Sequence, residues 1–402
     1  MRIIIMVLCG VLWLVNAGCS AESDARKERT VADIVKSTPF PKIGMCWGPL
    51  RGDRSDMGYA RHHEIMLSAD AIGLQYDHEL TVLATGFKPE SIPVAKAKVA
   101  EWKRLNRDAI VIVDQSFYEW GENDLPEDHP WWLKKDGKRQ QFWPGTYRAN
   151  WNLPDYQAAV IQRAVALWKT GVADGVFFDN WRNEQEPWLN ITRGIRAQVS
   201  DDFLIYVNVG YDIGTADWLA PYLNGIMYES GWSHPARAEW RPNETWDDRI
   251  RMMQHTESLL REPHISLIER FEEVRDHAGW PNDPNKGKEI KRDPATRHWT
   301  LAYALIIGEF YYLFSDSTSH RHDWYPEYDI KIGFPKGPGK RINAHVWERD
   351  YDKAKVVMNL PDATEPYQVT LPKPARDSFT SDEGTQFTVP PGDGRILVWQ
   401  EQ

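Results

Sequence analysis

Two acidic residues follow short apolar runs in the middle of the chain. Asp179 ends the segment GVFFD, and Glu229 ends the segment GIMYE. Two carboxyl groups that face one cavity suit glycosidic bond cleavage, because one must donate a proton to the leaving oxygen while the other, ionised, attacks or activates water. The predicted catalytic pair is therefore Asp179 as nucleophile or base and Glu229 as proton donor. The sequence is compatible with both the retaining and the inverting spacing.

Polar residues end several other apolar runs, and aromatic residues are abundant. The chain contains 20 Trp and 16 Tyr, a surplus that suits stacking on sugar rings, although many of these rings belong to the core. A single polar residue at a strand end often only caps a helix, but repetition around one rim favours a shared site. Asp174 begins its run, so it is assigned to the opposite face or to a turn. The residues expected to bind substrate are Asp114, Asn180, Asn208, Glu269, Trp47, Tyr76 and Trp181.

Eight apolar runs supply the strands that would position these residues. Each run is nearly continuous, as expected for parallel strands covered on both faces. Amphipathic stretches at 92–106 and 154–171 lie between them, and the second has a Pro–Asp start and a Gly stop, which are typical of a helix. The alternation favours an α/β fold of the (β/α)8 barrel type, whose strands end at one catalytic mouth. The predicted strands span 42–48, 69–76, 109–115, 175–180, 203–210, 224–230, 264–270 and 304–313, and the last is equally compatible with a helix.

An open doubly wound sheet is the competing fold, but no glycine-rich phosphate loop follows the first run. Beyond residue 341 the pattern changes to alternating segments with turn residues and no helical period. This change predicts a small antiparallel β domain, β-sandwich-like, packed on the barrel. The predicted organisation is a lipoprotein signal peptide at 1–19, a polar tether at 20–38, a catalytic barrel at 39–340 and the β domain at 341–402.

The N-terminus has the features of an export signal. Arg2 precedes an apolar segment at 3–15 that is too short to span a membrane comfortably, and NAGCS follows it. The small residues before Cys19 resemble a bacterial lipobox, in which the cysteine is lipidated and becomes the new N-terminus. Cleaved secretion and a retained anchor are the alternatives. Because Ser20 follows the cysteine, the resemblance implies a lipid anchor in the outer membrane of the cell envelope, facing the periplasm or the outside.

Charge and cysteine content argue against several other classes of function. A net charge of −10 and a pI near 5.7 disfavour nucleic acid as a partner, since no broad basic surface is implied. Cys9 and Cys19 fall in the signal segment, so Cys46 alone remains in the folded body, where a small buried side chain is expected. No spacing typical of metal ligands is present, and no cofactor is expected. The polar segments HHE at 62–64 and SHRHD at 319–323 are interpreted as solvated or lining a cleft.

Several segments resemble motifs of the barrel-type glycoside hydrolases, over most of the chain from about residue 40 to 400. DGVFFDNW at 174–181 is similar to their fourth-strand motif, and NGIMYESG at 224–231 is similar to their sixth-strand motif. These hydrolases include hypothetical families with small C-terminal β domains. The segments at 324–338 and 345–360 look like the passage from such a barrel into its terminal sheet.

The resemblance implies roles for individual residues. In α-galactosidase-like barrels the nucleophile ends strand four and the acid/base ends strand six, which gives these roles to Asp179 and Glu229, with Glu where that group usually has Asp. In α-amylase-like barrels the acid ends strand five, where this chain has Asn208, so that arrangement is disfavoured. The expected function is hydrolysis of glycosidic bonds in a polysaccharide or oligosaccharide. Two alternatives remain open: a non-catalytic carbohydrate-binding lipoprotein, and a barrel hydrolase or lyase for a non-sugar substrate, which a metal requirement would favour.

Overall fold

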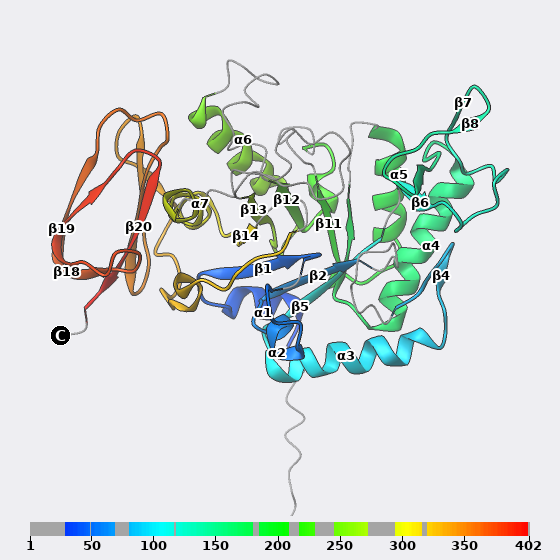
Figure 1. The fold of residues 1–402 in the computed structure, drawn as a ribbon, viewed down its shortest axis with the longest axis horizontal. Helices are drawn as coiled ribbons and strands as arrows, with labels where there is room; N and C mark the ends of the chain where they lie inside the picture. Colours follow the sequence, from blue (N-terminus) through cyan, green and yellow to red (C-terminus); the bar gives the residue numbers. More distant parts are fainter. Residues whose placement is uncertain are drawn as a thin grey trace, which may run out of the picture.

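The computed structural model describes residues 29–48, 50–68, 80–115, 118–179, 185–208, 217–229, 245–271, 294–315 and 320–400 (Figure 1). The predicted lipidation site Cys19 lies outside this part of the chain. So do the predicted strand at 69–76 and three residues expected to bind substrate, Tyr76, Asn180 and Trp181. No helix in the described ranges is long and apolar enough to span a membrane.

Eight parallel strands close into a barrel, which confirms the predicted (β/α)8 fold (Figure 1). Each strand pairs with its neighbour in chain order, and the last pairs with the first. The barrel strands are β1 (Lys42–Cys46), β2 (Glu64–Ser68), β5 (Ile110–Asp114), β10 (Gly175–Phe178), β11 (Leu204–Asn208), β12 (Gly225–Glu229), β13 (Leu267–Phe271) and β14 (Tyr311–Ser315).

Two of these strands differ from the predicted ones. The apolar run of β2 is short and starts with polar residues, so the sequence pattern does not reveal it. His62, His63 and Glu64 are all buried, so the interpretation of 62–64 as solvated or cleft-lining was wrong. Burial raises the pKa of Glu64 well above its ordinary value, so this side chain is neutral in the core. The predicted strand at 304–313 was wrong in its first part, because the chain remains helical to residue 307 and β14 begins at residue 311.

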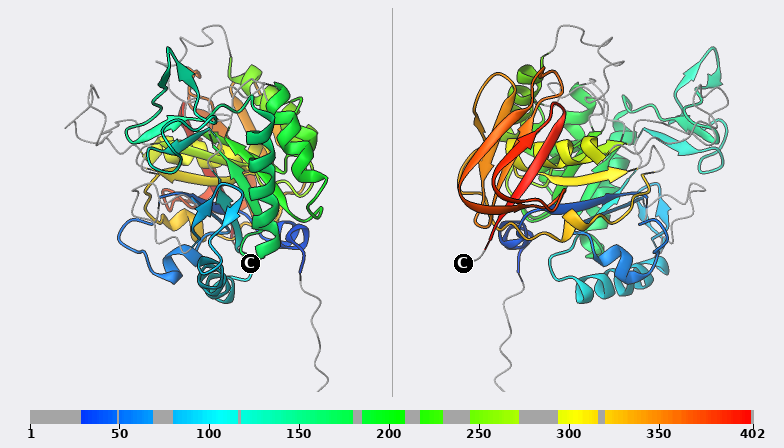
Figure 2. Two further views of the ribbon diagram at one scale, coloured as in Figure 1. Left: turned by 90° about the vertical axis from the view of Figure 1, so that its right-hand side faces the viewer. Right: turned by 60° about the vertical axis from the view of Figure 1, so that its left-hand side comes forward.

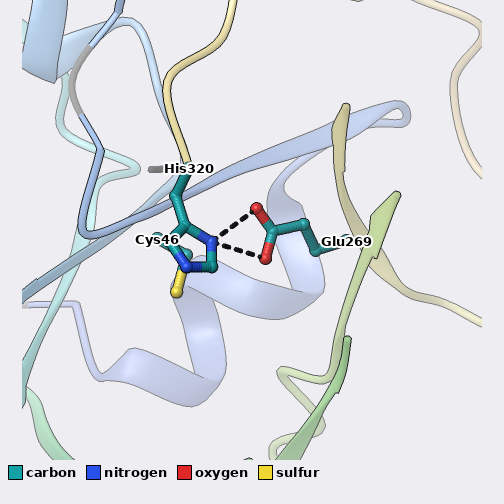
Figure 3. A group of neighbouring side chains, drawn as sticks. All are labelled: Cys46, Glu269 and His320. Carbon is teal, nitrogen blue, oxygen red and sulfur yellow. Dashed lines mark hydrogen bonds and ion pairs between the residues drawn. The ribbon is translucent and has the colours of Figure 1, made fainter. Parts of the chain in front are cut away.

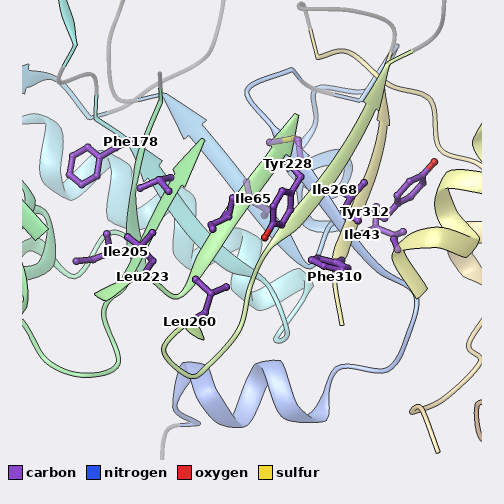
Figure 4. Close-up of a cluster of buried hydrophobic side chains, with 14 of the residues drawn as sticks. Ile43, Ile65, Phe178, Ile205, Leu223, Tyr228, Leu260, Ile268, Phe310 and Tyr312 are labelled. Atoms are coloured by element: carbon purple, nitrogen blue, oxygen red, sulfur yellow. The ribbon is translucent and has the colours of Figure 1, made fainter. Parts of the chain in front are cut away.

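Helices cover the outer face of the barrel, and the two predicted amphipathic stretches are confirmed as α3 and α4. Gly171 ends α4 with a φ of 63°, a left-handed conformation that glycine adopts readily at a helix end. Apolar side chains that point out of the barrel pack against the helices, and Figure 4 shows Tyr228 and Phe310 among them, with ring centroids 5.8 Å apart. The longer helices are α3 (Ser91–Leu105), α4 (Pro154–Thr170), α5 (Gln185–Arg196), α6 (Trp246–Leu259) and α7 (Pro294–Ile307).

Short elements complete the barrel. Helix α1 (Val31–Ser37) forms inside the segment predicted as a tether, and its buried side chains join the cluster that fills the barrel interior. Lys42, the first residue of β1, donates from Nζ to the carbonyl oxygen of Val35 at 3.0 Å, which holds α1 at the amino-terminal end of the barrel. The other short elements are α2 (Asp56–Ala60), η2 (Ala220–Tyr222), η5 (Pro326–Asp329), and the strand pairs β3 (Val82–Leu83) with β4 (Gly86–Phe87), β6 (Glu119–Gly121) with β9 (Thr146–Arg148), and β7 (Lys134–Lys135) with β8 (Lys138–Arg139).

A separate antiparallel sheet follows the barrel, as predicted. Figure 2 shows this sheet beside helix α7. A hydrogen bond joins the two, since Tyr351 Oη donates to the carbonyl oxygen of Leu305 at 2.7 Å. Its strand order is β15-β16-β17-β20-β18-β19, in one six-stranded sheet. The strands are β15 (Lys340–Arg341), β16 (Val346–Asp350), β17 (Ala354–Asn359), β18 (Tyr367–Asp377), β19 (Glu383–Val389) and β20 (Asp393–Trp399).

The alternation of side chains along the strands determines which residues face the barrel interior. Apolar residues of the strands, such as Phe177, Tyr206, Met227 and Leu267, form the interior cluster. Because side chains alternate with a period of two, the polar residues two positions further along the same strands also point inward, toward the carboxyl end of the barrel. These inward residues are Asp114, Asp179, Asn208, Glu229, Glu269 and Ser315.

Glu257 on helix α6 gives the fold a pH-dependent contribution. It accepts hydrogen bonds from Tyr228 Oη at 2.8 Å and Ser266 Oγ at 2.7 Å, and burial raises its pKa to about 7. A raised folded-state pKa stabilises the fold fully below the ordinary glutamate pKa, and this stabilisation is lost as pH rises through 7. Between pH 5 and 8 the free energy of unfolding should therefore fall by up to about 2 kcal/mol more in the wild-type protein than in Glu257→Gln. Urea titrations of both proteins across this range would test it, and parallel pH dependences would contradict it.

Candidate active site

Asn208 links the two predicted catalytic carboxylates. Its side-chain nitrogen donates to Asp179 Oδ1 at 2.9 Å and to Glu229 Oε2 at 3.0 Å. Since the two N–H bonds of a primary amide diverge by about 120°, the accepting oxygens lie about 5 Å apart. Asp179 directly follows β10, while Asn208 ends β11 and Glu229 ends β12. These strands are neighbours, so the barrel backbone itself fixes the spacing.

The surroundings of Glu229 favour its protonated form. Burial is the largest cause of its raised pKa. The positive charge of His320 and the hydrogen bond from Asn208 oppose the rise, whereas the negative charges of Glu269 and Asp179 add to it. Glu229 therefore keeps its proton to a higher pH than an exposed glutamate does.

Glu269 on β13 forms a buried ion pair with His320, which follows β14 (Figure 3). His320 Nδ1 lies 2.8 Å from Glu269 Oε1 and 3.0 Å from Oε2, and Ser315 Oγ donates to Oε1 at 2.7 Å. Burial lowers the pKa of His320, but the negative charges of Glu269, Glu229 and Asp179 outweigh this effect and leave it raised. The imidazole is therefore stabilised as a cation beside the carboxylates.

His320 and His322 are both buried, so the solvated alternative for 319–323 was wrong for its histidines, and His320 lies within the candidate site. His322 Nε2 lies 2.8 Å from Nε2 of His62, and this contact joins the segment to the end of α2. Burial lowers the pKa of His62 to about 3 and that of His322 to about 4, so this pair is neutral near neutral pH. The partners of these histidines are far away in the sequence, which is why the local pattern does not reveal them.

One group of side chains has the donor types that a metal ion requires. Cys46, Glu269 and His320 offer atoms within 4.8 Å of one another, and no other group of His, Cys, Asp and Glu does so in the described ranges (Figure 3). Both oxygens of Glu269 already accept hydrogen bonds from His320. Burial raises the pKa of the Cys46 thiol well above its ordinary value, with the nearby carboxylates adding to the rise, so the thiol stays protonated. We interpret the group as an ion pair beside a neutral, buried thiol.

Trp47 and Asp114 complete the cluster on the side of β1 and β5. Trp47 Nε1 donates to Asp114 Oδ2 at 3.0 Å, and its ring meets the imidazole of His320 edge to face, with centroids 4.6 Å apart. The structure therefore brings together six of the predicted residues: Asp114, Asp179, Asn208, Glu229, Glu269 and Trp47.

Asp174 lies at the opposite end of the barrel, as expected from its place at the start of a strand. It accepts from the backbone nitrogen of Val111 at 2.8 Å and pairs with Lys103 at 2.7 Å. His320 and Ser315 were not predicted as site residues. The only sequence signal for His320 is the polar segment after an apolar run, and Ser315 gives none.

Comparisons with known proteins agree with this architecture. A family model described as "Hypothetical glycosyl hydrolase family 15" matches residues 99–355, well over half of the chain. No curated protein matches the chain.

Solved structures with a similar fold include three α-amylases. A noncanonic maltogenic α-amylase from Thermotoga neapolitana has a TM-score of 0.54 at 9% identity, with 90% of this chain and 98% of that chain covered. An α-amylase from Lactobacillus plantarum has a TM-score of 0.54 at 9% identity, with 92% and 100% covered. An α-amylase from Geobacillus thermoleovorans, solved with acarbose, has a TM-score of 0.50 at 15% identity, with 86% and 90% covered. At these identities the likeness concerns the fold.

Proposed function

Since the chain belongs to hypothetical glycosyl hydrolase family 15 and is a barrel-type glycoside hydrolase, we propose that it cleaves O-glycosidic bonds of an oligosaccharide or polysaccharide with a pair of carboxylates. Asp179 is the nucleophile and Glu229 is the general acid and base. The observation that carries this proposal is the bridge from one Asn208 amide to both side chains. Its spacing of about 5 Å between carboxylate oxygens suits a double displacement with retention of configuration, because an inverting pair needs room for a water molecule.

The first step pairs proton donation with nucleophilic attack. Glu229 donates its proton to the glycosidic oxygen while the Asp179 carboxylate attacks the anomeric carbon, and the bond to the leaving sugar breaks. Glu229 is then ionised and removes a proton from water, which attacks the glycosyl–Asp179 ester and regenerates both side chains. The raised pKa of Glu229 supports its role as the acid in the first step.

Asp114, Glu269 and Trp47 are proposed to surround the sugar that is attacked. Carboxylates there bind sugar hydroxyls, and Trp47 supplies an apolar face. We also propose that lipidation of Cys19 tethers the enzyme to the cell envelope through the outer membrane, a proposal that rests on the residues before and after Cys19.

A panel of glycans tests the proposed activity. The panel should begin with α-glucans, because the similar structures include α-amylases, and should extend to β-glucans and to aryl α- and β-glycosides. Wild-type enzyme should hydrolyse at least one substrate, and NMR of the first product should show the anomeric configuration of the substrate. Glycan binding without turnover, unchanged in Asp179→Asn and Glu229→Gln, would instead support the non-catalytic carbohydrate-binding alternative.

A further inference from the structure

His320 is an imidazole enclosed by acidic side chains from several barrel strands. It is buried, and it follows β14 in the chain. Its own loop contributes His322, whose Nδ1 lies 3.3 Å from the carbonyl oxygen of His320. The titratable groups of the strands around it are Cys46 on β1, Asp179 after β10, Glu229 on β12 and Glu269 on β13. Asp114 on β5 binds Trp47, whose ring packs against the imidazole.

The strand register places this imidazole next to the proposed acid. Glu229 and Glu269 are paired residues on the neighbouring strands β12 and β13, and both point into the barrel. Neighbouring strands lie about 4.8 Å apart, so a cation bonded to one carboxyl group is close to the other. His320 is bonded to both oxygens of Glu269, which fixes the position of its charge.

The backbone at this place also indicates that the side chain matters. His320 has a φ of 55°, and Trp47, which packs against it, has a φ of 50°. Residues with a Cβ adopt this left-handed conformation only at a free-energy cost, and such strain gathers at functional sites. Glycine would avoid the cost but would remove the imidazole and the indole. A backbone hydrogen bond anchors the same segment two residues later, since the backbone nitrogen of Arg51 donates to the carbonyl oxygen of His322 at 2.7 Å.

We propose that His320 is a positioning residue whose positive charge, fixed by Glu269, keeps Asp179 ionised while Glu229 holds the proton. Without this charge, the carboxyl groups around Asn208 would compete for protons, because like charges disfavour one another's ionisation. With the charge of His320 in place, Asp179 and Glu269 can both be ionised beside a protonated Glu229. The inference rests on the proposed roles of Asp179 and Glu229, and it adds a residue that acts through them.

Carboxyl-carbon NMR of glutamate-labelled protein tests this without needing a substrate. The signal of Glu229 is assigned by its loss in Glu229→Gln and is then titrated in wild-type protein and in His320→Asn. Loss of the cation should raise the titration midpoint of Glu229 by about one pH unit or more. His345→Asn is the matched control, because His345 also pairs with a carboxylate, Asp362, at 3.2 Å, but in the C-terminal β domain. In His345→Asn the titration midpoint of Glu229 should equal that of the wild-type protein.

Two further variants complete the test. His320→Lys restores a positive charge and should return the midpoint of Glu229 toward the wild-type value, and His320→Gln replaces the asparagine variant if that protein does not fold. An unchanged midpoint in the charge-removing variant would overturn the inference. The pH profile of kcat/KM should move upward together with the midpoint, whereas a lower kcat at an unchanged profile would reduce His320 to a structural role. Retained activity in Asp179→Asn would instead refute the proposed catalytic pair.

Discussion

Replacement of Asp179 by asparagine should lower kcat/KM by at least about 10⁴-fold for every glycan that the wild-type enzyme hydrolyses. The amide nearly preserves the shape of the side chain but cannot form the glycosyl–enzyme bond. Glu229→Gln should lose about 10²–10⁴-fold, and only on substrates whose leaving oxygen needs a proton. Aryl glycosides with very acidic phenols should therefore rescue the first step in Glu229→Gln and leave Asp179→Asn inactive. Steady-state kinetics on a series of aryl glycosides, whose phenol leaving groups differ in acidity, would measure this difference.

The same strand supplies a matched control for the first substitution. Asp174→Asn changes an aspartate at the opposite end of the barrel, where it binds Lys103 and the backbone of Val111. This variant should lose stability and keep its kcat. Glu257→Gln, on helix α6, serves in the same way for Glu229→Gln. If the variants of Asp179 and Glu229 showed the same leaving-group dependence, the two residues would not have separate roles as nucleophile and acid.

Much of the fold and of the candidate site follows from patterns that are local in the sequence. Continuous apolar runs predict parallel strands, and polar residues at their ends predict a rim of catalytic and binding groups. Asp179, Asn208 and Glu229 were found in this way because each ends a long run on neighbouring strands. The alternation of side chains then brings the three into hydrogen-bonding distance, although 50 residues separate the first from the last.

The rest depends on partners that are distant in the sequence. His320 pairs with Glu269, and His62 meets His322, which is 260 positions away. A histidine in a polar segment is ordinarily solvated, and only the tertiary fold shows that these are buried. Strand β2 was missed for a related reason, because Glu64 starts it and a buried, neutral glutamate has the same letter as an exposed, charged one.

Asn208→Asp should be more harmful than Asn208→Ala, although aspartate preserves the shape of the side chain. Asparagine donates two hydrogen bonds, one to each member of the pair, and an ionised carboxylate donates none. Alanine only removes these bonds, which should lower kcat by about 10²-fold. Aspartate adds a second negative charge beside that of Asp179, so a proton would be retained where Asp179 must be ionised, and kcat should fall by about 10³-fold or more.

The relative effects of the aspartate and alanine substitutions on kcat distinguish an electrostatic role of Asn208 from simple packing. If Asn208 only filled space, aspartate would be the milder change, because alanine leaves a cavity and aspartate does not. Asn224→Asp is the matched control, since Asn224 is also a buried asparagine of the barrel but bonds to the carbonyl oxygens of Arg261 and Glu262, away from the carboxylates. That variant should lose stability and retain kcat. Kinetics of the three variants, normalised to folded protein, would decide between the two roles, and a more active aspartate variant would show that Asn208 does not control the charges of the pair.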